Sequence, residues 1–110
     1  MIRKLQELGC DMEGSMGRFL NDQEFYKECF LKFVEERELE KLGSVIVSGD
    51  VEEAFAQAHS LKGTLGNLGL TPIYNQMVDI VELLRQGEMS GVPQRYQELM
   101  KEWEQYKNLR

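Results

Sequence analysis

The sequence is poor in the residues that build metal sites and disulfides. Its 110 residues include two cysteines, two prolines and one histidine. Cys10 and Cys29 lie far from each other and from His59, without the closely spaced pair from which zinc sites are built. We therefore expect no metal site, and in a reducing compartment no disulfide. The two thiols are interpreted as small, half-buried side chains.

Positive charge and long apolar runs are also scarce. The 13 Lys and Arg residues face 19 Asp and Glu residues, which leaves a net charge of -6. Such a surface repels a polyanion, so nucleic acid is not expected as a partner. No apolar run approaches the roughly 20 residues of a membrane span, and the first residues turn polar too soon for a signal peptide. We expect a cytoplasmic protein without a membrane segment.

The residues that are present predict one all-α domain over residues 1–110. Apolar residues make up 42% and charged residues 29% of the chain, as in ordinary globular domains. The apolar residues recur every three or four positions, which is the period of amphipathic helices, and alternating strand patterns are absent. We predict an antiparallel four-helix bundle with a short extra N-terminal helix. One bundle can bury its own core, so a monomer is expected.

Capping signals place the helices along the chain. Asn21 or Asp22 can cap the first long helix, and Asp50 with Glu53 has the spacing of a capping box. Thr71 followed by Pro72 marks another start, with threonine at the cap and proline at the first helical position. The predicted helices cover residues 2–8, 22–47, 51–68, 72–86 and 93–106, and a loop with at most a helical turn at 16–20 follows the first of them.

The first long helix has an irregular apolar stripe. Its apolar residues change phase near Arg37 and Glu38. Either the helix bends at this point or its two halves contact different neighbours, and the sequence leaves both alternatives open.

The helix over residues 51–68 carries the one chemically suggestive cluster. At about 100° per residue, its apolar stripe centres on Ala58, whereas His59 lies about 100° away on a flank. Gly63 and Gly66 lie on the same flank, and Lys62 follows His59 at the border of the stripe. Each glycine inside a helix costs about 1 kcal/mol relative to alanine. Stability alone therefore does not explain why two glycines lie beside the histidine.

These residue types suit the transient attachment of a phosphoryl group. A neutral imidazole nitrogen is a good nucleophile near pH 7. The two glycines clear side chains from the surface around the ring, so that a large partner can approach it. Lys62 can place a positive charge beside an anion that forms on the ring. The cluster indicates an acceptor histidine with open access.

The run AHSLKGTLGNLGL at residues 58–70 closely resembles the signature of histidine-containing phosphotransfer (HPt) domains. That signature is His, two residues, Lys-Gly, four residues, an aliphatic residue and Gly. Upstream, residues 18–34 and Ser48-Gly49-Asp50 are also similar to the family, whereas the last helix matches only in pattern. The resemblance covers most of the chain and implies a helical bundle with an exposed histidine.

The resemblance also implies roles for particular residues. His59 would take phosphate from an aspartate on one receiver domain and give it to another, Lys62 would give electrostatic support, and Gly63 and Gly66 would allow close approach of the receiver. Expected partners are a response-regulator receiver domain and a hybrid sensor histidine kinase. Any Mg²⁺ would belong to the receiver, and no cofactor is expected on this chain. Since phosphate-loop and ATP-site motifs are absent, we expect a phosphocarrier and no ATP-dependent kinase activity.

One position departs from the family pattern. Some relatives carry a glutamine near the histidine ring on the next helix, where this chain has Val81, and Gln76 and Asp79 on that helix have no assigned role. Two alternatives therefore stay open beside a free-standing phosphocarrier. One is an HPt-like docking module that binds a receiver without accepting phosphate, and the other is a plain helical interaction domain with an incidental histidine.

Overall fold

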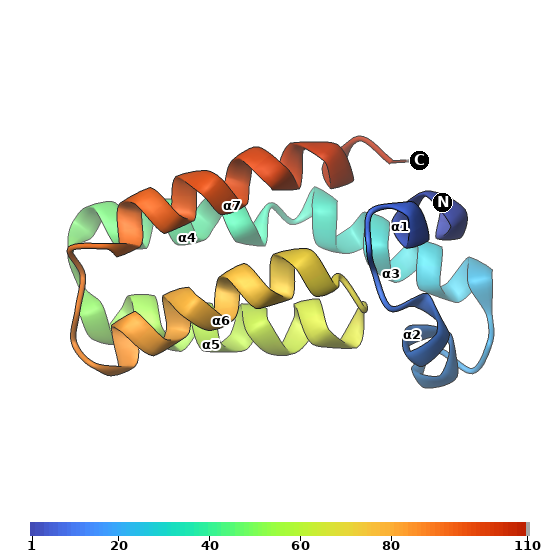
Figure 1. Ribbon diagram of the computed structural model, residues 1–110, viewed down its shortest axis with the longest axis horizontal. Coiled ribbons are helices and arrows are strands. Elements are labelled where there is room, and N and C mark those ends of the chain that lie inside the picture. The colour runs from blue at the N-terminus through green and yellow to red at the C-terminus, as the bar shows by residue number, and fades with distance from the viewer. Residues whose placement is uncertain (110) are drawn as a thin grey trace.

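The computed structural model describes residues 1–109, which contain helices and no strand (Figure 1). None of these helices has both the length and the apolar character needed to cross a membrane. The helices are α1 (Ile2–Glu7), α2 (Met12–Arg18), α3 (Gln23–Glu35), α4 (Glu38–Ser48), α5 (Val51–Asn67), α6 (Thr71–Arg85) and α7 (Val92–Lys107).

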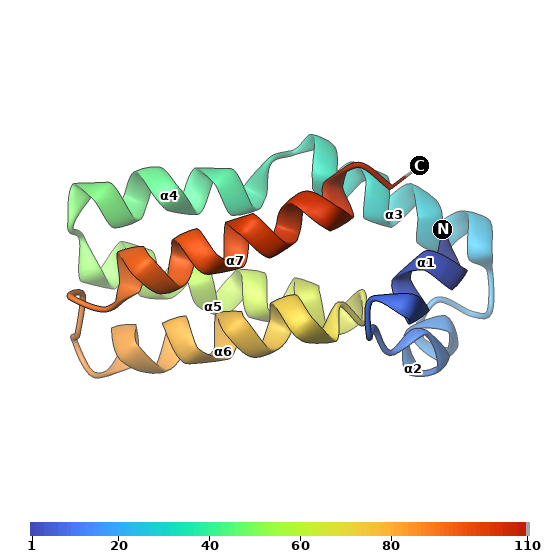
Figure 2. The same cartoon turned by 45° about the horizontal axis from the view of Figure 1, so that its top comes forward.

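Helices α4 to α7 form an antiparallel four-helix bundle. Each packs against two neighbours, in the cyclic order α4, α5, α6, α7. In Figure 1, α4 and α7 form the upper pair and α5 and α6 the lower pair. In the turned view of Figure 2, α7 lies below α4, and its C-terminal end passes in front of α3. The predicted all-α bundle is confirmed. Short connections between successive helices force this up-and-down arrangement.

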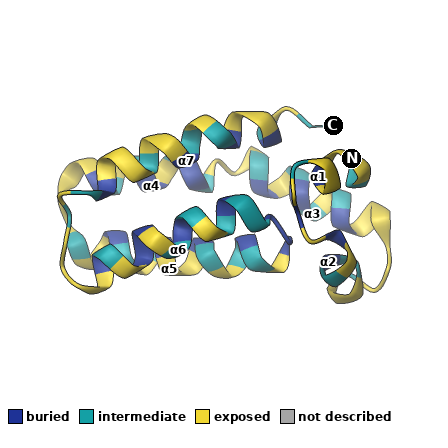
Figure 3. Cartoon of the chain, in the orientation of Figure 1, coloured by how far each residue is buried: buried dark blue, intermediate teal, exposed yellow. Residues whose placement is uncertain are grey.

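Helices α1, α2 and α3 close one end of the bundle, beside the turn between α5 and α6 (Figure 1). Aromatic side chains fill the core there: the Trp103 ring stacks on Tyr106, with centroids 5.7 Å apart, and meets Phe33 edge to face. The buried residues line the inward faces of the helices in Figure 3. Cys10 is buried in this region and Cys29 is partly exposed, both as free thiols.

The single long helix expected over residues 22–47 is instead two helices. Helix α3 ends at Glu35, and Arg37 takes a left-handed conformation, φ 55° and ψ 37°, before α4 begins at Glu38. This break resolves the phase change in the apolar stripe. Phe30 and Phe33 of α3 meet Trp103, while Leu42 of α4 is buried in the four-helix core. An unbroken helix would turn one of these stripes away from the core.

Two further boundaries differ from the sequence prediction. The loop expected after Gly9 contains helix α2, whose N-cap Asp11 accepts a hydrogen bond from the Gly14 N–H at 3.0 Å. The protein thus has two short N-terminal helices, because burial of Met12 and Ser15 stabilises a segment that its glycines disfavour. Helix α6 begins one residue early, with Leu70 at the N-cap. Thr71 is therefore not the capping residue.

Candidate functional site

Helix α5 holds His59 on the outer surface of the bundle. The helix begins at the cap predicted from the sequence, where Asp50 Oδ1 accepts the N–H of Glu53 at 3.1 Å. Its buried residues are Ala54, Ala58, Leu61 and Leu65. His59 is exposed, one residue beyond the buried Ala58. The imidazole is therefore open to a docking protein, as its position on the helical wheel predicts.

Two side chains without a predicted role lie near the histidine, Phe55 against its ring and Arg85 against Phe55. The half-buried Phe55 ring packs against the His59 ring, with centroids 5.7 Å apart and planes inclined by 31°. The Arg85 guanidinium lies 5.2 Å from the centroid of Phe55 and also forms an ion pair of 3.2 Å with Glu82. An aromatic ring with a cation over it limits the orientations open to the histidine.

The sequence gives a signal for the position of Phe55 but none for that of Arg85. Phe55 is four positions before His59 on the same helix, a spacing that places two side chains in contact, so the contact was readable in the sequence. Arg85 comes from the end of α6. No local pattern relates Arg85 to Phe55, and only the packing of α6 against α5 brings the two side chains together.

Lys62 and Gly63 lie on the next turn after His59. Lys62 is partly exposed and forms no ion pair with any carboxylate of residues 1–109. A Cβ atom added to Gly63 would meet nothing within 4 Å. Packing inside the protein therefore gives no reason for glycine at this position. The bare backbone at Gly63 faces solvent beside the histidine.

Gly66 has a packing role within the protein. A Cβ at this position would lie 3.3 Å from Tyr74 Cε2 on α6, closer than ordinary van der Waals contact. Glycine thus lets the Tyr74 ring lie against α5. Gly66 still shares a flank with His59, two turns farther along the helix.

The end of α5 is a closed turn built on Gly69. The N–H of Leu70 donates to the carbonyl of Leu65 at 3.0 Å and that of Gly69 to Gly66 at 3.1 Å. Gly69 has φ 71°, so its predicted place at the helix C-terminus is confirmed.

Side chains from the N-terminal segment hold this helix end. Ser15 Oγ donates to the Asn67 carbonyl at 3.0 Å, and Arg18 Nε donates to the same oxygen at 3.1 Å. The Tyr26 hydroxyl donates to the Leu68 carbonyl at 2.6 Å, and burial raises the pKa of this hydroxyl above its ordinary value. Tyr26 therefore remains a proton donor throughout the physiological range, and the last turn of α5 is fixed to α2 and α3.

Val81 of α6, at the position where some relatives carry a glutamine, is fully buried in the core and offers no hydrogen bond to the histidine. Gln76 donates to Glu102, and Asp79 pairs with Arg95 at 3.4 Å. Both partners belong to α7. The polar residues of α6 that the sequence left without a role therefore face α7, and they are engaged there.

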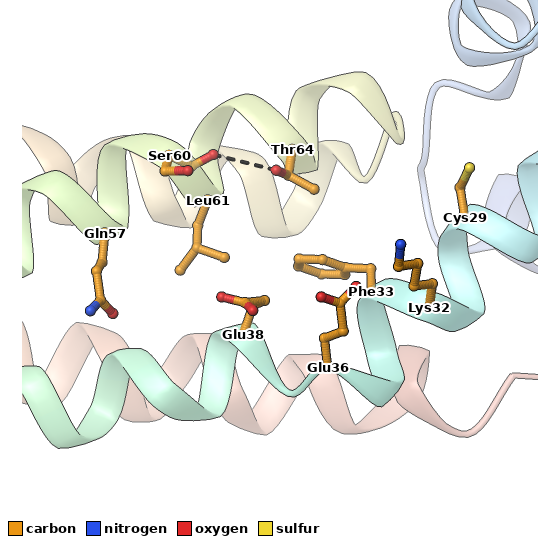
Figure 4. Close-up of a pocket in the computed structure, with 9 residues that line it drawn as sticks. All are labelled: Cys29, Lys32, Phe33, Glu36, Glu38, Gln57, Ser60, Leu61 and Thr64. Atoms are coloured by element: carbon orange, nitrogen blue, oxygen red, sulfur yellow. Dashed lines mark hydrogen bonds between the residues drawn. The ribbon is translucent and has the colours of Figure 1, made fainter.

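A groove runs along the other flank of α5, between that helix and the α3–α4 junction (Figure 4). Its α5 wall includes Ser60 and Thr64, and the Thr64 hydroxyl donates to the Ser60 carbonyl at 3.4 Å. Glu36 and Glu38 line the opposite wall. The groove contains none of the predicted site residues. One of them, Gly66, lines a second hollow, together with Asp11, Arg18 and Tyr74.

An exposed imidazole beside an unpaired ammonium and a bare turn of backbone can accept a small electrophilic group from a protein that docks on it. The family model described as "Hpt domain" matches residues 26–109, well over half of the chain. The match includes the last helix and begins after α1 and α2. The comparisons with curated proteins and with solved structures gave no significant match.

Proposed function

Because this chain belongs to the Hpt domain family, we propose that His59 carries a phosphoryl group between receiver-domain aspartates in a multistep phosphorelay. Hpt domains perform histidine phosphotransfer in two-component relays, together with receiver domains and kinases. The observation that supports this role for His59 is the exposure of the chain's one histidine on a helix flank whose next turn has no side chain at Gly63.

The transfer is a reversible displacement at phosphorus. The unprotonated nitrogen of the His59 imidazole attacks the phosphorus atom of the receiver's aspartyl phosphate. A nitrogen–phosphorus bond forms while the bond to the carboxylate oxygen breaks, and the carboxylate leaves with the electron pair. The proton on the other ring nitrogen is then free to pass to water. Attack by an aspartate of a second receiver reverses these steps and restores the imidazole.

The neighbouring residues assist this step in different ways. Lys62, three residues after His59, places an ammonium where it reduces repulsion between the incoming phosphoryl group and a chain of net charge -6. Gly63, and beside it Gly66, leave room for the rim of the receiver's active site. Phe55 supports the ring from the other side. Mg²⁺ and the remaining catalytic groups belong to the receiver, so this chain acts as a carrier.

The direct test is incubation of the purified protein with a receiver domain that carries phosphate on its aspartate. Intact-mass spectrometry should show one added phosphoryl group, and peptide mapping should place it on His59. The label should vanish in acid and survive base, because a phosphorus–nitrogen bond to imidazole is acid-labile. Absence of the label with a competent donor would contradict the carrier role.

The same experiment separates the alternatives. A receiver that binds the chain while His59 stays unmodified would favour the docking module over the carrier. Absence of any receiver contact, or contacts that tolerate replacement of both Lys62 and Gly63, would favour a plain helical interaction domain.

Substitution of Gly63 by glutamine should impair docking without weakening the fold. Glutamine is a better helix former than glycine, and the space around Gly63 is open, so the urea midpoint should stay the same or rise. Transfer from a phosphorylated receiver should fall at least about tenfold relative to labelling by the small phosphoryl donor phosphoramidate. The reason is that a long side chain then lies where the receiver approaches. Quenched time courses of labelling with the phosphorylated receiver and with phosphoramidate measure the ratio of the two rates.

Ser44→Gln is the matched control. Ser44 is also helical and exposed, but it lies on α4 and not on the histidine helix. An equal loss of receiver-dependent transfer in both variants would show that clearance at Gly63 is not what the receiver requires.

A further inference from the structure

Arg18 contacts the end of α5 at Gly66, which shares a flank with His59, although Arg18 comes from outside the matched domain. It is the last residue of α2, and the family match begins at residue 26. Its Nη2 donates to the Gly66 carbonyl at 2.9 Å and its Nε to the Asn67 carbonyl at 3.1 Å. Gly66 is seven residues after His59, which corresponds to about 10 Å along a helix axis. The guanidinium is thus fixed two turns from the histidine.

The two carbonyl groups that Arg18 contacts do not depend on it. The Gly66 oxygen also accepts the Gly69 N–H at 3.1 Å, and the Asn67 oxygen also accepts the Ser15 hydroxyl at 3.0 Å. Both acceptors would keep a partner without Arg18. Capping of the helix end therefore does not account for an arginine at this position, even though a cation there is favourable for the helix dipole.

The guanidinium is exposed and has no carboxylate partner. Arg18 forms no ion pair with any residue of the chain from 1 to 109, whereas Arg85, Arg95 and Arg3 all do. Asp11 lines one hollow with Arg18 and Gly66, but Asp11 Oδ1 accepts the Gly14 N–H and forms no ion pair with Arg18. Arg18 thus presents a positive charge with unused N–H donors to the solvent beside α5.

The charge distribution supports an anionic partner on this face. The chain has 19 acidic residues, yet residues 54–78, which include the whole of α5 after its first turn and half of α6, contain no Asp or Glu. Lys62 in the middle of this segment and Arg18 at its end are both without an ion-pair partner among residues 1–109. This segment therefore carries no negative charge in an otherwise acidic protein, which favours the approach of an acidic protein surface.

We propose that Arg18 belongs to the receiver-docking face and pairs with a carboxylate side chain of the receiver, about two helical turns from His59. A standard interface covers about 800 Å² on each partner, so a receiver centred on His59 extends about 16 Å in each direction and reaches Arg18. The inference rests on the proposed function. It assigns a docking role to the N-terminal segment, which lies outside the matched domain.

The test compares four variants with the unmodified protein, using whichever phosphorylated receiver domain labels it fastest in a panel. Arg18→Met should lower kcat/KM for transfer about fivefold relative to labelling by phosphoramidate, mainly by raising KM. Arg18→Lys should keep most of the kcat/KM of the unmodified protein. Ser15→Ala loses the buried hydrogen bond to the same Asn67 carbonyl without changing the surface, and Arg3→Met removes an equal charge from α1. The kcat/KM of both controls should stay within twofold of that of the unmodified protein.

Salt provides a second readout that a structural role would not change. Receiver-dependent transfer should weaken with rising ionic strength, and it should weaken less in Arg18→Met because one screened attraction is already gone. A KM for Arg18→Met within twofold of the unmodified protein, or an equal rise in Ser15→Ala, would overturn the docking role of Arg18. If no receiver in the panel labels the unmodified protein, the proposed function fails, and the docking role of Arg18 fails with it.

Discussion

Replacement of His59 by glutamine should reduce phosphoryl incorporation to background, a loss of at least about a hundredfold with both a phosphorylated receiver and phosphoramidate. The glutamine amide has a similar reach, but its nitrogen lone pair is delocalised into the carbonyl group and is not nucleophilic. The chain has no second histidine to take over the role. Intact-mass spectrometry of the variant beside the unmodified protein measures the effect.

The His59→Gln fold should remain intact. His59 is exposed, and its one described ring contact is with Phe55, so unfolding free energy should change by no more than about 0.5 kcal/mol. Ser60→Ala is the matched control, because Ser60 is the adjacent exposed residue on the same helix. Full labelling of Ser60→Ala together with none of His59→Gln assigns the phosphoryl group to the histidine. A residual acid-stable label in His59→Gln would show that the phosphoryl group is attached to another residue.

Substitution of Gly69 by alanine should cause the largest loss of stability, about 3 kcal/mol. Alanine at φ 71° has a steric cost of about 1 to 2 kcal/mol. In addition, its Cβ would collide with the backbone oxygen of Asp11, which cannot move as the end of a flexible side chain can. The Asp11 N–H bond to the Gly69 carbonyl, 2.9 Å long, would be strained as well. Urea or thermal unfolding followed by circular dichroism measures the loss.

Gly49→Ala separates the two contributions. Gly49 has φ 79°, but a Cβ there would meet nothing within 4 Å. Its substitution should therefore show the conformational cost alone, about 1 to 2 kcal/mol. At roughly 4 °C per kcal/mol for a domain of this size, Gly69→Ala should melt about 12 °C lower than the unmodified protein. Equal losses for both variants would contradict the close contact between α5 and the N-terminal segment.

The sequence determined the helical class and the position of the histidine on its helix, because both follow from local periodicity. Apolar spacing places Ala58 in the core and His59 on a flank, whatever the neighbouring helices do. Asp50 at the N-cap and Gly69 at the C-terminus act within one turn of chain, and the structure has both as predicted. The motif around His59, Lys62 and Gly63 was likewise contiguous, and the family match over residues 26–109 agrees with it.

The tertiary structure decided everything that depends on which helices meet. The break at Arg37 arises because α3 and α4 face different parts of the core, and no local signal at this arginine requires a left-handed residue. Burial of Met12 and Ser15 makes a helix of a segment that its glycines disfavour. The contacts of Gly66 with Tyr74 and of Arg18 with the end of α5 join residues far apart in sequence. Sequence periodicity reports which face of a helix is apolar, but only packing determines which side chains come to lie beside the histidine.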